Sequence, residues 1–199
     1  PETAEIVAEG LHEGSYRLLV LGVKGEKEND GATVNKITNV NDVWLSFPED
    51  LGKPLDCEYF YSNTPFDVTI TESADGKQET ILNGGTVTQH RIVGKVKFNF
   101  DFENIYVEYS VTQNVANAKT PRFYTSMTAD KHFSGQSTTT LRELNLSNER
   151  EYLFMPTVEG QTMSGKIGMV SRTYTGGSLS QTYGFSGIKI LPNQITTVN

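Results

Sequence analysis

The residue types best placed for catalysis are two carboxylates, Asp101 and Glu103, two positions apart. Residues at this spacing on a β-strand point to the same face, and glycosidases use a facing pair of carboxylates as acid and base or nucleophile. A simpler interpretation also fits, because Phe100 and Phe102 alternate with the pair and would form the apolar face of the same strand. We therefore predict a solvent-facing strand surface here, and no catalytic residue.

Metal and cofactor chemistry has equally little support. His12, His90 and His132 are far apart in sequence and lack the spacing of a zinc motif. The acidic and amide residues at 28–30 and 39–42 offer oxygen ligands, but they lack the alternating spacing of a calcium-binding loop. The nucleophile-elbow, phosphate-loop and dinucleotide-binding patterns are absent. The sequence thus predicts solvated loops, no metal site, no cofactor and no enzyme activity.

The single cysteine, Cys57, cannot form a disulfide within the chain. A lone cysteine usually behaves as a small buried hydrophobic residue, and this is the interpretation we adopt. Its presence gives no information about the cellular compartment.

Aromatic residues could form a binding platform. Trp44, Tyr59, Tyr61, Tyr106 and Tyr109 would stack on sugar rings if they were exposed in a row, which would indicate a non-catalytic carbohydrate-binding module. Alternation along a strand instead places such residues in the core or at its rim. A third alternative, an enzyme, would need a deep pocket with converging carboxylates or histidines.

The elements that must position these residues are β-strands. Thr, Val, Tyr, Phe and Ile are plentiful, Gly occurs 18 times, and 36% of the 199 residues are hydrophobic. β-branched and aromatic side chains favour strands. The formal net charge of −7 excludes the basic surface expected of a nucleic-acid-binding protein. No apolar run approaches the roughly 20 residues of a membrane span.

Several strands can be placed by their alternation and by their turns. Residues 91–102 have Ile92, Val96 and Phe98 on one face and lysines on the other. Hairpins are predicted for 66–71 with 79–82, across Asp75-Gly76, and for 164–175 with 179–183, across Gly176-Gly177. Further strands are predicted at 14–23, 43–47, 59–61, 105–111, 151–157, 187–191 and 195–198, with loops at 24–36 and 113–140.

This pattern contains no helical period and no alternation of strands with helices. It predicts an all-β antiparallel sandwich of about ten strands with long loops. We expect a single domain over residues 1–199, with the alternative that it is the N-terminal domain of a longer two-domain protein.

Three segments, in this order, resemble strands of the fimbrillin-like proteins of Bacteroidales, a group that includes fimbrial anchor proteins and minor subunits. They are residues 13–20 (EGSYRLLV), 88–96 (TQHRIVGKV) and 191–198 (LPNQITTV). The resemblance implies the transthyretin-like Greek-key sandwich of that pilin superfamily. It also implies a fimbrial subunit, tip or anchor component with an adhesive or structural role.

The same resemblance implies a place and a mode of assembly. Such proteins are exported as lipoproteins with a lipid anchor upstream of the domain, and they lie on the outer membrane or in the fimbrium. Their partners would be other fimbrial subunits or ligands on host or bacterial surfaces. Assembly would proceed by β-strand addition. We expect Ile195, Thr196, Thr197 and Val198 to form the exchanged strand, because this alternating segment stops at Asn199.

Overall fold

The computed structural model describes residues 10–25, 30–51, 53–72, 74–76, 78–84, 86–99, 115–119, 121–138, 144–145, 150–172 and 176–199. Within these ranges the chain forms fifteen strands and no helix, so a helix that could cross a membrane does not occur in this part of the chain. The all-β class is confirmed, and several antiparallel sheets give an architecture consistent with a sandwich. The number of strands exceeds the prediction because many of them are only two to four residues long.

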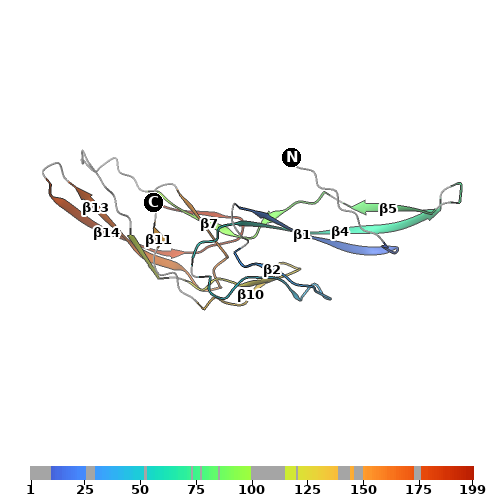
Figure 1. The fold of residues 1–199 in the computed structure, drawn as a ribbon, viewed down its shortest axis with the longest axis horizontal. Coiled ribbons are helices and arrows are strands. Elements are labelled where there is room, and N and C mark those ends of the chain that lie inside the picture. Colours follow the sequence, from blue (N-terminus) through green and yellow to red (C-terminus); the bar gives the residue numbers. More distant parts are fainter. Residues whose placement is uncertain are drawn as a thin grey trace.

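One sheet projects to one end of the elongated molecule (Figure 1). It contains β1 (Gly14–Lys24), β4 (Glu58–Glu72) and β5 (Gln78–Gly84) in that order, and β6 (His90–Arg91) also pairs with β4. The predicted hairpin is confirmed as β4 and β5, with Gly76 in the turn at a φ of 76°. A left-handed conformation of this kind is one that glycine adopts without strain.

Strand β4 includes two segments, 59–61 and 66–71, that were predicted as separate strands. It continues through Pro65, which pairs with Arg17 of β1. On the other side, β6 pairs with Phe60 and Tyr61 and β5 begins opposite Phe66. Pro65 therefore has no partner on this second side among the described residues, and proline is tolerated at a strand position with an open side.

A second sheet consists of short strands in the order β10 (Phe133–Ser134), β9 (Ser126–Thr128), β3 (Val43–Ser46) and β2 (Thr33–Val34). Three of the four lie in segments predicted as loops. Two or three residues carry too little alternation to be recognised in a sequence. Two of them, β2 and β9, become strands by pairing with the two edges of β3, which was predicted, and β10 then pairs with β9.

Two further sheets complete the fold. The first has the order β12 (Glu151–Phe154), β7 (Gly94–Phe98) and β15 (Ile195–Val198). The second, towards the end of the molecule opposite β5 (Figure 1), has the order β11 (Leu144–Asn145), β8 (Val115–Lys119), β13 (Met163–Arg172) and β14 (Ser178–Ile188). The predicted hairpin at Gly176 is confirmed as β13 and β14.

The strand predicted at 91–102 is interrupted. β6 ends at Arg91 and β7 starts at Gly94, while Ile92 and Val93 between them are both fully buried. At Gly94 the backbone passes very close to the segment before β15. A Cβ atom there would lie 2.5 Å from Cγ2 of Ile190 and 2.5 Å from the carbonyl oxygen of Leu191.

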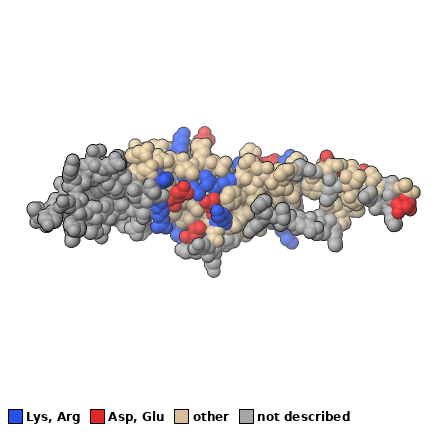
Figure 2. All heavy atoms as spheres, turned by 90° about the horizontal axis from the view of Figure 1, so that it is seen from above, with Lys and Arg blue, Asp and Glu red and all other residues tan. Residues whose placement is uncertain are grey.

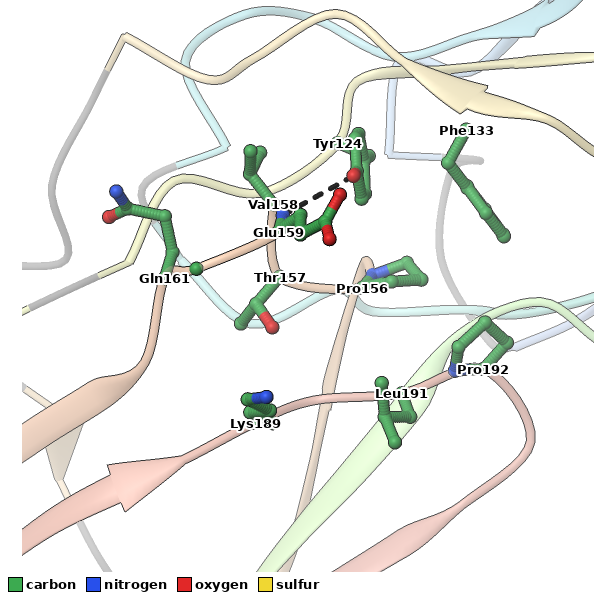
Figure 3. Close-up of a pocket in the computed structure, with 11 residues that line it drawn as sticks. Tyr124, Phe133, Pro156, Thr157, Val158, Glu159, Gln161, Lys189, Leu191 and Pro192 are labelled. Carbon is green, nitrogen blue, oxygen red and sulfur yellow. Dashed lines mark hydrogen bonds between the residues drawn. The ribbon is translucent and has the colours of Figure 1, made fainter.

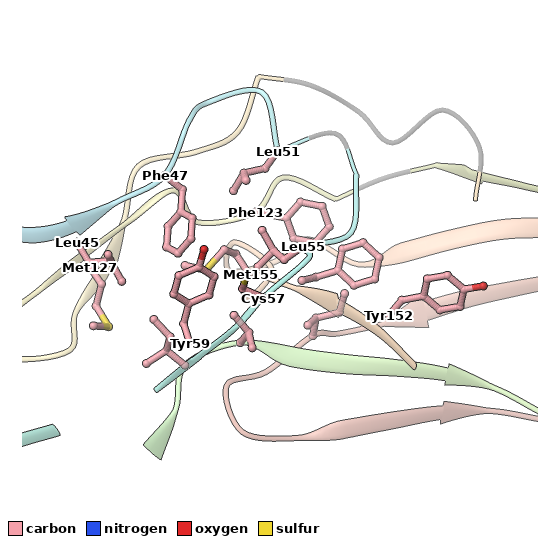
Figure 4. Close-up of a cluster of buried hydrophobic side chains, with 14 of the residues drawn as sticks. Leu45, Phe47, Leu51, Leu55, Cys57, Tyr59, Phe123, Met127, Tyr152 and Met155 are labelled. Atoms are coloured by element: carbon pink, nitrogen blue, oxygen red, sulfur yellow. The ribbon is translucent and has the colours of Figure 1, made fainter. Parts of the chain in front are cut away.

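The hydrophobic core lies where β3, β4, β7, β9 and β12 meet (Figure 4). Aromatic rings give it much of its volume. Phe123 and Phe154 stack with centroids 5.4 Å apart, and Phe47 meets Tyr59 edge to face at 5.0 Å. Such pairs add about 0.5–1.5 kcal/mol beyond the burial of their apolar area.

Candidate functional site

The predicted exchange segment Ile195–Val198 forms β15, which lies at the edge of its sheet and pairs with β7. The pairing is parallel, whereas the other strand pairs in the described chain are antiparallel. Asn193, at a φ of 57°, turns the chain into this strand. β15 is therefore a short strand laid along β7 after a tight turn.

Two hydrogen bonds show which groups of β15 face β7. The N–H of Lys95 donates to the carbonyl of Gln194 at 2.9 Å, and the N–H of Asn99 donates to the carbonyl of Val198 at 2.8 Å. Alternate residues of a strand direct their backbone groups to the same side, so Thr196 also faces β7. The backbone groups of Ile195 and Thr197 consequently face the outer edge.

Outer strand edges carry exposed apolar side chains. In the part of the chain that the structure describes, β5, β14 and β15 each have a partner strand on one side only. Ile81 on β5, Tyr183 on β14 and Ile195 on β15 are 40%, 49% and 52% exposed. Unpaired edges flanked by apolar side chains can recruit a further strand.

Three of the five aromatic residues considered for sugar stacking lie within the described residues, and all three are buried. Trp44, Tyr59 and Tyr61 are 6%, 0% and 4% exposed and belong to the core. Tyr106 and Tyr109 lie outside the described residues.

In the turns that contain Asp30 and Asp42, the carboxylates accept hydrogen bonds from backbone N–H groups. Asp30 accepts hydrogen bonds from the N–H groups of Asp56 and Cys57 at 2.8 and 3.0 Å. Asp42 accepts from the N–H groups of Thr38 and Asn39, which lowers the pKa of its carboxyl.

No cluster of three or more metal-ligating side chains occurs among the described residues. Glu28 and Asn29 fall outside them, as do Asp101 and Glu103. Cys57 is fully buried, as its interpretation as a small hydrophobic residue predicts.

Acidic and basic side chains gather near the middle of one face (Figure 2). Lys95 of β7 lies 2.6 Å from Glu58 of β4 and 2.8 Å from Glu151 of β12, and Arg91 of β6 lies 3.9 Å from Glu58. Burial disfavours the charged form of Lys95, but the hydrogen bonds to Glu151 and Glu58 outweigh it and raise its pKa. These ion pairs join two sheets, so the cluster is a structural feature. The buried Nε of Arg91 has no hydrogen-bond partner among the described residues.

A shallow hollow with a volume of about 310 Å³ opens beside the start of β15 (Figure 3). Three chain segments form it. The residues that line it are Tyr124, Phe133, Pro156, Thr157, Val158, Glu159, Gly160, Gln161, Lys189, Leu191 and Pro192.

Backbone hydrogen bonds hold these three segments together. The N–H of Tyr124 donates to the carbonyl of Pro156 at 3.0 Å, and the N–H of Thr157 donates to the carbonyl of Ile190 at 3.0 Å. The hollow is therefore preformed. Sequence reasoning missed it, because its members are spread over residues 124–192 and share no spacing motif.

No protein-family model matches this chain, and no curated protein and no solved structure matches it either.

Proposed function

We propose that this chain is a structural or adhesive protein of a bacterial cell surface. It is a fimbrial subunit, tip or anchor component with a transthyretin-like Greek-key sandwich, exported as an outer-membrane lipoprotein. Other fimbrial subunits or surface ligands are its partners. The three motifs at 13–20, 88–96 and 191–198 support this proposal, since they resemble fimbrillin-like strands in the same order.

The observation that carries the proposed mode of assembly is the pairing of β15 with β7. In the described chain, this parallel strand of four residues follows a tight turn and pairs with one neighbouring strand. Ile195 on this strand is 52% exposed. Such a strand can leave its own β7 and pair with β7 of a neighbouring copy, which exchanges identical hydrogen bonds at little net cost.

Deletion of residues 194–199 tests this mechanism. The variant should expose the edge of β7 and have a lower melting temperature. It should fail to donate a strand to a neighbouring copy, so that sedimentation velocity detects no assembly. It should also bind a synthetic peptide of residues 192–199, which the intact chain should not. Unchanged stability together with unchanged assembly would exclude β15 as the exchanged strand.

Two proline variants of that peptide provide a matched comparison. Thr196→Pro removes an N–H that faces β7 and should abolish binding to the deletion variant. Thr197→Pro removes an N–H that faces the outer edge and should bind nearly as well as the natural sequence. Equal loss of binding in both peptides would contradict the register described above.

A further inference from the structure

The hollow beside β15 is lined by both apolar and polar side chains (Figure 3). The apolar lining is formed by Tyr124, Phe133, Pro156, Leu191 and Pro192. The polar lining lies on the loop after β12 and on the segment before β15, and its side chains are Glu159, Gln161 and Lys189. A ligand that fills the hollow must therefore be amphipathic.

The apolar lining presents half-buried aromatic surface. The rings of Tyr124 and Phe133 lie with centroids 5.8 Å apart and planes inclined by 32°. Leu191 also lines this side of the hollow and is 42% exposed. This exposed apolar area is available to the C–H groups of a ligand.

The polar lining offers both donors and acceptors. The hydroxyl of Tyr124 accepts a hydrogen bond from the N–H of Glu159 at 3.3 Å, and its own hydrogen is not used by that bond. Thr157 is engaged with the backbone of Ile190, so it belongs to the wall. The carboxylate of Glu159, the amide of Gln161 and the ammonium of Lys189 remain as groups that can address hydroxyls. Their formal charges cancel, which favours an uncharged ligand.

We propose that this hollow binds a neutral saccharide. A pyranose ring has an apolar face of C–H groups and a rim of hydroxyls, and this combination matches the apolar and polar lining of the hollow. Its volume of about 310 Å³ is at the lower end of the range for small-ligand sites, which suits one or two sugar units. The inference does not depend on strand exchange, because none of the lining residues belongs to β15.

Saturation-transfer-difference NMR tests this with glucose, galactose, mannose, N-acetylglucosamine and their common disaccharides as probes, followed by titration of the strongest. We expect millimolar binding of at least one probe. Glu159→Ala removes a charged acceptor and should weaken that binding about tenfold. Leu191→Ala removes apolar contact area and should weaken it roughly threefold to fivefold.

Lys131→Ala is the matched control, because Lys131 is an exposed side chain that lines a separate hollow beside β4. It should leave the titration unchanged, and all three variants should keep the thermal unfolding of the natural chain. Absence of transfer to every saccharide overturns the proposal. Saturation transfer that neither Glu159→Ala nor Leu191→Ala weakens also overturns it. A third contrary outcome is that a proline-rich peptide binds at this hollow while none of the sugars does. A failure of strand exchange leaves these outcomes unaffected.

Discussion

The hydroxyl of Tyr59, a fully buried core residue, donates a hydrogen bond to Oδ2 of Asp30 at 3.1 Å. Asp30 lies 29 residues earlier in a surface turn and adopts a φ of 50°. Burial raises the pKa of Tyr59 above its usual range, and the charge of Asp30 raises it further. The carboxylate of Asp30 thus links the turn before β2 to the hydrophobic core.

Replacement of that carboxylate should loosen the loop. Asparagine tolerates the left-handed backbone at position 30. Its amide nitrogen accepts no hydrogen bond, so the groups that donate to one of the two carboxylate oxygens lose their acceptor. We expect a loss of about 1–3 kcal/mol in the free energy of unfolding, measured with urea. Tyr59→Phe removes only one of the three bonds and should cost less. A smaller effect of Asp30→Asn than of Tyr59→Phe would contradict this account.

Gly94 should tolerate no side chain, because the backbone carbonyl of Leu191 cannot move aside as a flexible side chain would. Gly94→Ala is expected to lower the free energy of unfolding by about 1–3 kcal/mol. Gly184→Ala is the control, since a Cβ atom at Gly184 has no neighbour within 4 Å. Thermal unfolding of both variants gives the comparison. Equal stability of the two would show that the segments at Gly94 and Leu191 can separate without cost.

Stability at acidic pH should depend on Glu151. The hydrogen bond from Lys95 lowers the pKa of Glu151 below its ordinary value of 4.5. The folded state therefore favours the carboxylate, and this stabilisation is complete above about pH 4.5 and is lost as the pH falls through the lowered pKa. For Lys95, whose pKa is raised from 10.5, the stabilisation is complete below that pH and is lost above it.

Glu151→Gln removes the acidic part of this dependence. The melting temperatures of the natural chain and the variant should differ at neutral pH and converge as the pH falls below about 4.5. The control is Glu159→Gln, which replaces an exposed carboxylate that does not belong to the ion-pair cluster. A difference between Glu151→Gln and the natural chain that stays constant down to strongly acidic pH would show that the ion pair is not responsible.

Cys57 should be unreactive in the folded protein. Its side chain is fully buried, so a thiol reagent can reach it only after local or global opening. We expect negligible labelling by an aromatic disulfide reagent in native buffer and complete labelling in denaturant. Asp30→Asn should increase the native labelling rate, because Asp30 accepts the N–H of Cys57. Rapid labelling of the natural chain would show that the segment just before β4 opens readily.

The sequence by itself determined the features that depend on near neighbours. Alternation and β-branched residues predict the strands at 14–23, 43–47 and 195–198, and all of them occur. Glycine-containing turns predict the hairpins at Asp75-Gly76 and Gly176-Gly177. Both signals are local, because side-chain direction alternates along one strand and left-handed turns favour glycine.

Only the tertiary structure decided which strands meet. Pro65 lies within β4 at a position that pairs with β1 but, among the described residues, with neither β5 nor β6, and the strand expected at 91–102 breaks where Gly94 meets Ile190 and Leu191. The parallel pairing of β15 with β7 joins segments a hundred residues apart, and the hollow brings Tyr124 beside Leu191. These relationships depend on packing between distant segments, which a pattern read along one segment does not contain.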